Sequence, residues 1–170
     1  MRPSPVTRLM HFAWTLVPLS IGIFSVLIVS APISVGGSVT GINLPLIVVY
    51  FWALYRPDLL PPWAIFLIGF FQDLLTGGPV GLWAMVYLLV YALMLTQRVL
   101  LLARGSGAAW MGFLGIALLA AFVAFVIASL YNGQTVSIQA LSIQTGLTIL
   151  AYFFVSPLLT FIQRRWMRQA

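Results

Sequence analysis

Six runs of apolar residues follow one another along the chain, separated by short polar or glycine-rich segments. A helix needs roughly 20 apolar residues to cross the hydrocarbon core of a bilayer, and most of these runs approach or exceed that length. The sequence therefore predicts one all-α membrane domain over residues 1–170, a polytopic bundle of six transmembrane helices. The predicted spans are approximately 9–30, 43–55, 61–75, 80–101, 108–130 and 138–162.

The second and third predicted spans are short. From Leu44 to Tyr55 a helix rises only about 18 Å, whereas the hydrocarbon core is about 30 Å thick. Either the glycine-rich stretch before Asn43 continues the crossing, or this pair of segments is partly re-entrant. Non-helical backbone at that depth must be buried in protein or line a wet cavity. Asn43 is placed to cap the second helix, and Pro45 is tolerated in its first turn.

The composition also indicates that the chain lies in a membrane. Hydrophobic residues make up 62% of the chain and charged residues only 6%, whereas about a quarter of a typical soluble domain is charged. Such a chain has too few polar side chains to cover its surface in water. We therefore expect membrane lipid to surround it.

The basic residues are arginines, and they give an independent check on the six-span arrangement. They are Arg2, Arg8, Arg56, Arg98, Arg104, Arg164, Arg165 and Arg168. Six spans place all of them on the side of both termini, which the positive-inside rule makes cytoplasmic. They lie between apolar runs or at the chain ends rather than along one polar face. We therefore expect no nucleic-acid partner.

Asp73 is the most informative polar residue, because it lies near the outer end of the third span and acids are costly in a membrane. Three interpretations are open. The carboxylate is an ion or proton site, or it is a polar anchor to a partner helix. Alternatively, it is a helix-end acid that binds loop amides between Thr76 and Gly78 or meets water. No arginine is predicted on its side of the membrane.

A catalytic centre is hard to build from this chain. The other acid, Asp58, is expected to pair with Arg56 across a proline-containing turn, on the opposite side from Asp73. The sequence has no cysteine and one histidine, His11, so the ligands of a metal site are missing. We expect no catalytic residues, no metal and no cofactor.

Small residues recur on one face of the fifth predicted span. Their spacing of four, three and four residues places Ala117, Ala121, Ala124 and Ala128 together on that face. Small side chains let helices approach closely in lipid. The face either packs inside the bundle, which we favour, or docks a partner helix.

One segment resembles a known family. The stretch Gly69-x-x-x-Asp73-Leu-Leu-x-Gly77-x-Pro79-x-Gly81 resembles the signature of the rod shape-determining protein MreD family. Pro45 and the Arg56-Pro57 turn also lie where that family tends to have them. In physical terms, Gly69 allows close packing of a neighbour, and the residues from Gly77 to Pro79 fix a tight entry into the fourth span. Asp73 then lies against that turn.

The resemblance implies a non-catalytic scaffold or regulator in bacterial cell elongation, located in the inner membrane. It implies MreC as a partner, and RodA-type glycosyltransferases, a penicillin-binding transpeptidase and MreB as further partners. It also implies a fold similar to the substrate-binding subunits of energy-coupling-factor transporters. The alternative hypothesis is a substrate-binding subunit of a vitamin-type transporter, because short spans broken by glycine and proline can mark a substrate site.

Overall fold

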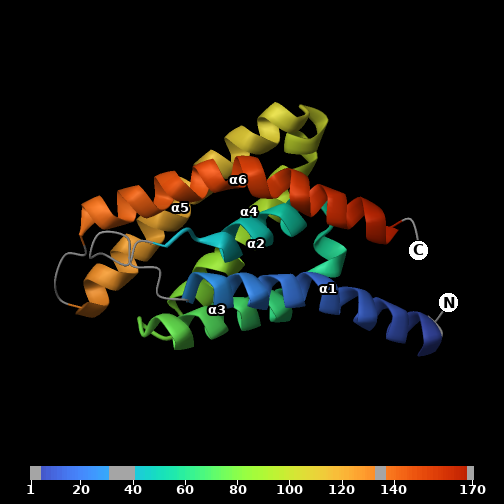
Figure 1. The fold of residues 1–170 in the computed structure, drawn as a ribbon, viewed down its shortest axis with the longest axis horizontal. Coiled ribbons are helices and arrows are strands. Elements are labelled where there is room, and N and C mark those ends of the chain that lie inside the picture. The colour runs from blue at the N-terminus through green and yellow to red at the C-terminus, as the bar shows by residue number, and fades with distance from the viewer. Residues whose placement is uncertain (1–4, 31–40, 133–136, 168–170) are drawn as a thin grey trace.

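The computed structural model describes residues 5–30, 41–132 and 137–167 and is all-α within these ranges. The all-α prediction is confirmed. Within the described residues the chain forms six α-helices and one short 3₁₀-helix between the second and third, and Figure 1 shows how the helices pack together. The elements are α1 (Pro5–Ser30), α2 (Leu44–Tyr55), η1 (Pro57–Leu59), α3 (Pro62–Thr76), α4 (Leu82–Ala103), α5 (Ser106–Asn132) and α6 (Ile138–Met167).

Each helix falls on one of the predicted apolar runs, with differences at the ends. Helix α1 begins at Pro5 and α6 continues to Met167, beyond the apolar runs in both cases. Helical hydrogen bonding requires no apolar side chains, so a helix can continue where the hydrophobic run has ended. Helix α4 begins at Leu82 because Gly81 before it has a φ of 97°, outside the helical region.

Among the described residues, three helices rather than the six predicted spans are long and apolar enough to cross a membrane by length and composition. They are α4, α5 and α6, over Leu82–Ala103, Ser106–Tyr131 and Ile138–Arg165. The expected shortness of the second and third segments is confirmed, since α2 has 12 residues and α3 has 15. In α1, the part whose side chains are described forms a shorter apolar helix, Thr15–Val29.

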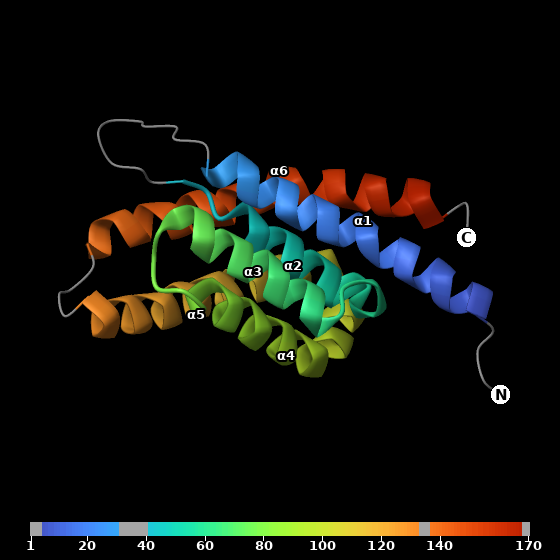
Figure 2. The ribbon, with the colours of Figure 1, turned by 90° about the horizontal axis from the view of Figure 1, so that it is seen from below.

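Helix α2 forms the centre of the bundle. Every residue from Pro45 to Leu54 is buried, and α2 contacts α1, α4 and α6. Figure 2 shows α2 running between its neighbours rather than on the outside. A helix that is apolar on all sides is stable only when it is enclosed, so the composition of α2 explains its position.

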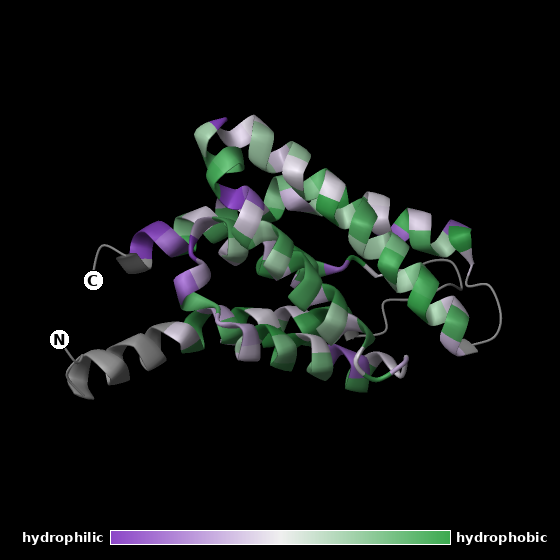
Figure 3. Cartoon of the chain, turned by 180° about the vertical axis from the view of Figure 1, so that it is seen from behind, coloured by the Kyte–Doolittle hydropathy of each residue, from purple (hydrophilic) through white to green (hydrophobic). Residues whose placement is uncertain are grey.

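The outer faces of the longer helices are also apolar. Phe122 on α5 is 64% exposed, and Phe154 on α6 is 73% exposed. Green, the colour of hydrophobic residues, predominates along the outside of the bundle in Figure 3. Large exposed apolar surfaces are unusual on soluble monomers, and a hydrocarbon solvent accounts for them.

The arginines that the structure describes lie toward one end of the bundle. The start of α1, the end of α6, η1 and the α4–α5 connection all lie there (Figure 1). Arg56 precedes η1, Arg104 follows α4, and Arg164 lies in the last turn of α6. The fold thus brings arginines that are distant in sequence to the same end.

Candidate functional site

The connection between α3 and α4 is a turn built on two glycines. Gly77 ends α3 with a φ of 67°, and its N–H donates to the carbonyl of Asp73 at 3.2 Å. Gly81 precedes α4 with a φ of 97°. Residues with a Cβ atom rarely adopt these conformations. Directly after Gly81, the N–H of Leu82 donates to the carbonyl of Pro79 at 3.1 Å.

The Asp73 side chain closes this turn from inside the protein. The residue is 2% exposed. Its Oδ2 accepts from the N–H of Gly81 at 2.8 Å and its Oδ1 accepts from the N–H of Trp83 at 2.9 Å. The N–H of Ala84 lies 3.5 Å from Oδ2. These amides have no partner within α4, and a negative charge is favoured at a helix N-terminus. Asp73 therefore serves as an intramolecular cap of α4.

Gly69 permits the close contact between α3 and α4 that places Asp73 at this N-terminus. A Cβ atom on Gly69 would lie 2.4 Å from the Cα of Ala84 and 2.7 Å from the carbonyl carbon of Trp83. Both are backbone atoms, so the obstacle cannot rotate away. The expected close packing at Gly69 is present, and its neighbour is α4 of the same chain.

A chain of buried polar side chains extends from this site across the bundle. The Tyr87 hydroxyl on α4 lies 2.7 Å from the Oδ1 of Asn43 and 2.5 Å from the Oε1 of Gln72 on α3, and it can donate its single proton to either oxygen. Asn43 caps α2, as expected, by accepting from the N–H of Leu46 at 3.3 Å. Its own N–H donates to the Oγ1 of Thr148 on α6 at 2.9 Å. The chain therefore connects α2, α3, α4 and α6.

We expect Tyr87→Phe to lower the stability of the bundle by about 1–3 kcal/mol, because two buried amides lose the hydroxyl between them. Thermal unfolding in mild detergent, followed by tryptophan fluorescence, measures the change. Tyr131→Phe is the matched control, since Tyr131 is 71% exposed. Equal unfolding temperatures for the two variants would show that the polar chain contributes nothing to stability.

The turn between α2 and α3 carries the other acid. Arg56 pairs with Asp58 at 3.0 Å, and both side chains are partly exposed. Partial burial alone would raise the pKa of Asp58, but the hydrogen bonds and the charge of Arg56 hold that pKa below its ordinary value. The carbonyl of Pro57 accepts from the Tyr91 hydroxyl at 3.3 Å, which ties the turn to α4.

The alanine face of α5 lies inside the bundle. Ala117 is 2% exposed and Ala124 is 5% exposed, while Ala121 and Ala128 are half-buried. Ala128 packs against the core, and Ala121 lines a cavity described below. This placement agrees with the internal-packing interpretation of the face.

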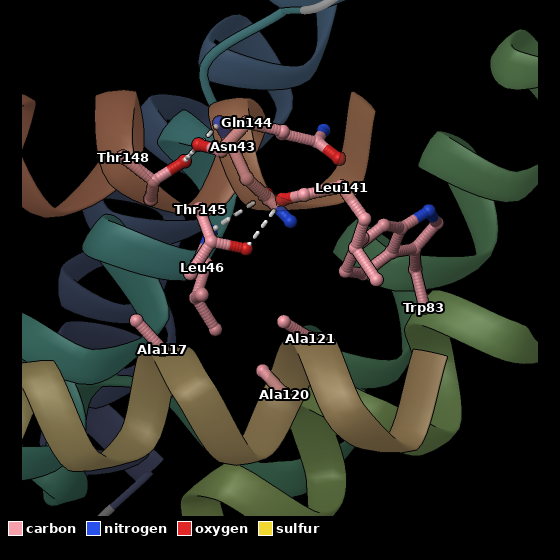
Figure 4. Close-up of a pocket in the computed structure, with 10 residues that line it drawn as sticks. All are labelled: Asn43, Leu46, Trp83, Ala117, Ala120, Ala121, Leu141, Gln144, Thr145 and Thr148. Carbon is pink, nitrogen blue, oxygen red and sulfur yellow. Dashed lines mark hydrogen bonds between the residues drawn. The ribbon is translucent and has the colours of Figure 1, made fainter. Parts of the chain in front are cut away.

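Two hollows lie against α5 and α6, and the first of them adjoins the polar chain. The first is a cavity of about 20 Å³ bounded by residues of α2, α4, α5 and α6, including Asn43 and Thr148. The second is an open, mainly apolar groove of about 410 Å³ between α5 and α6. Figure 4 shows Asn43, Leu46 and Thr145 on one side of the first cavity and the alanines of α5 on the other.

Sequence reasoning missed three members of the polar chain, namely Gln72, Tyr87 and Thr148. Gln72 carried a usable signal, because a polar residue beside Asp73 in an apolar span needs a buried partner. Tyr87 resembles the other aromatic residues of the spans. The partner of Thr148 lies 105 residues away along the chain, so no local pattern reveals it.

Comparison of the chain with models of protein families, with curated proteins and with solved structures finds no match. In the part of the chain that the structure describes, the protein is all-helical, and three helices are long and apolar enough to cross a membrane. Both acids are engaged within the chain, Asp58 by Arg56 and Asp73 by backbone amides. The site stabilises an arrangement of helices rather than presenting a free reactive group.

Proposed function

We propose that this chain is a non-catalytic membrane scaffold of the MreD type, acting in cell elongation with MreC and the associated peptidoglycan synthases. The proposal rests on the segment that carries the resemblance. Gly69 allows contact between α3 and α4, Asp73 caps α4, and Gly77 and Gly81 shape the turn. The motif residues thus form one structural unit, which supports a shared origin better than isolated identities do.

A scaffold must be rigid, and the contacts between α3 and α4 at the motif residues make this part of the bundle rigid. The carboxylate of Asp73 accepts two short hydrogen bonds, from the N–H groups of Gly81 and Trp83 at the α4 N-terminus. Helices α3 and α4 lie so close together that a Cβ atom on Gly69 would meet the backbone of α4. Since Asp73 is buried, any influence on a partner passes through the turn rather than through its charge. The exposed surface nearby includes Leu74, Leu75 and Val80, which are apolar and suited to a partner in the membrane.

The alternative hypothesis, a vitamin-type carrier subunit, requires a cavity large enough for a small molecule. A small-molecule site typically has a volume of about 300–1,000 Å³ with a few convergent polar groups. The cavity beside Asn43 and Thr148 has about 20 Å³, which is the size of a single water molecule, and the groove of about 410 Å³ between α5 and α6 is open and mainly apolar. Neither hollow on its own combines the volume with the convergent polar groups of such a site, which favours the scaffold.

The proposal includes six spans in the bacterial inner membrane with both termini in the cytoplasm. Helix α2 is short because protein surrounds it on all sides, so its length need not match the bilayer. Helix α3 presents Phe66, Leu67 and Phe71 outward. The common position of the arginine-bearing ends supports a cytoplasmic side at that end of the bundle.

Single-cysteine labelling tests this topology, because the chain contains no cysteine of its own. We expect Gly78→Cys and Ser137→Cys to react with a membrane-impermeant maleimide in intact spheroplasts. Gly107→Cys and Asp58→Cys should react only after permeabilisation. All four positions are exposed. Labelling of Gly78→Cys and Gly107→Cys from the same side would rule out the six-span arrangement.

The functional test is purification from native membranes through a C-terminal tag in mild detergent. Recovery of MreC with glycosyltransferase or transpeptidase partners is the expected result. Recovery of ATPase subunits together with a tightly bound small molecule would overturn the proposal and establish a carrier subunit. Trp110→Ala, a change on the exposed face of α5, serves as a folded reference variant in the same experiment.

A further inference from the structure

The cavity next to the polar chain contains an unused hydrogen-bond donor. Asn43 is 4% exposed, and its Oδ1 is engaged by the N–H of Leu46 and by the Tyr87 hydroxyl. Its NH₂ group has no hydrogen-bond partner among the described residues. Among the described residues, the fully buried side-chain polar atoms that have no hydrogen-bond partner are Trp52 Nε1 and Ser129 Oγ. The NH₂ of Asn43 is not among these fully buried atoms, and Asn43 lines the cavity.

The cavity adjoins the larger groove. Ala121, Leu141 and Thr145 line both hollows, so the groove between α5 and α6 leads toward Asn43. The groove holds about 410 Å³, within the range of small-molecule sites. Its walls are mainly apolar, with Leu118, Phe122 and others on the α5 side.

The lining residues restrict the chemistry of an occupant. Neither hollow is lined by a charged side chain, so nothing there would neutralise a phosphate or an ammonium group. The inner cavity admits about one oxygen atom, and the Asn43 NH₂ offers a proton to it. The groove accepts an apolar chain. These features suit a carbonyl or hydroxyl oxygen at the end of a hydrocarbon tail.

We propose that the groove and the inner cavity together form a binding site for a neutral single-chain amphiphile, such as a monoacylglycerol. Its tail lies between α5 and α6, and its carbonyl or hydroxyl oxygen accepts from the NH₂ of Asn43. A transmembrane helix of a partner protein fits less well. Its backbone carbonyls are already bonded within the helix, and a helix is about 10–12 Å wide. This inference is independent of the MreD-type assignment.

Photo-crosslinking of the purified full chain in detergent tests the site. The probe is a monoacylglycerol with a diazirine in the middle of its acyl chain, and adducts are mapped by mass spectrometry. We expect adducts concentrated on α5 and α6, competed by unmodified monoacylglycerol. Monoacyl phosphatidic acid with the same chain should compete about tenfold less well, because the site has no cation for its phosphate.

Two glycine variants separate the groove from the general lipid surface. A Cβ atom at Gly146 or at Gly115 would meet nothing within 4 Å, so both helices tolerate a larger side chain there. Gly146 lines the groove, and Gly115 does not. We expect Gly146→Leu to reduce crosslinking by about tenfold and Gly115→Leu to leave it unchanged. Equal crosslinking in the two variants, or adducts spread evenly over all outer faces, would overturn the proposal.

Asn43→Ser tests the polar end. Serine retains an oxygen that caps α2 but lacks the NH₂ group. We expect the variant to remain monodisperse and to bind the monoacylglycerol probe more weakly, with adducts no longer localised to the groove. Unchanged crosslinking by a folded Asn43→Ser protein would show that the NH₂ does not bind the ligand.

Discussion

Asp73→Ala is expected to destabilise the protein more than any other substitution of a polar side chain. The change removes the acceptor of two short hydrogen bonds and leaves the N–H groups of Gly81 and Trp83 unpaired in a buried site. A bond to a charged group contributes about 1.5–3 kcal/mol, and an unpaired buried donor costs a similar amount. We expect a loss on the order of 3–5 kcal/mol, since two such bonds are lost. Yield of monodisperse protein and unfolding temperature in detergent measure it.

The chain supplies its own control, because its only other acid is Asp58. Asp58→Ala removes an exposed pair with Arg56, and such pairs contribute about 0–1 kcal/mol. Asp73→Asn should lie between the two alanine variants, since the amide keeps one oxygen but turns an NH₂ group toward the α4 amides. An Asp73→Ala protein as stable as Asp58→Ala would contradict the capping role.

Substitution of Asp73 also separates an effect on folding from an effect on assembly with a partner. If the α3–α4 turn is the partner surface, a mild change at the turn should weaken recovery of MreC at unchanged protein level. Asp73→Asn is suited to this comparison because it perturbs the turn without adding volume. A parallel decline of protein level and of complex would assign Asp73 to folding alone.

Much of the fold can be predicted from local features of the sequence. The six apolar runs predict the six helices, Asn43 predicts the cap of α2, and Gly77 predicts the end of α3. These features depend on residues within a few positions of one another, so hydrophobic pattern and turn chemistry reveal them. The position of Asp73 against the turn also follows, but its carboxylate binds the amides of Gly81 and Trp83 rather than the predicted amides between Thr76 and Gly78.

The remaining features depend on contacts between distant segments. Tyr87 meets Asn43 across 44 residues of sequence, and Asn43 meets Thr148 across 105. Gly22 packs so closely on α3 that a Cβ atom would lie 2.3 Å from the side chain of Ile68. No pattern in one helix predicts which helix faces it. The cavity beside Asn43 is a consequence of that packing and is equally invisible in the sequence.

Gly69→Val is expected to have the second large effect, and it acts through volume rather than charge. The new Cβ would lie 2.4 Å from the Cα and 2.5 Å from the N atom of Ala84, so α3 and α4 must separate. Overpacking costs about 1–3 kcal/mol, and more where a backbone must move. Separation would also draw Asp73 away from the α4 amides and add part of the cost of losing that cap. We therefore expect a loss of at least about 3 kcal/mol, measured as thermal unfolding in detergent.

Gly115→Val is the control that assigns this loss to the contact. Both positions lie within helices, so the two variants share the effect of a β-branched residue on helix propensity, which is below about 1 kcal/mol. They differ in their surroundings, because a Cβ atom at Gly115 meets nothing within 4 Å. A Gly69→Ala variant should already be impaired, since the clash begins at the Cβ itself. Equal stability of Gly69→Val and Gly115→Val would mean that the space between α3 and α4 accommodates a larger side chain. In that case the hydrogen bonds of Asp73 alone would maintain its position at the α4 N-terminus.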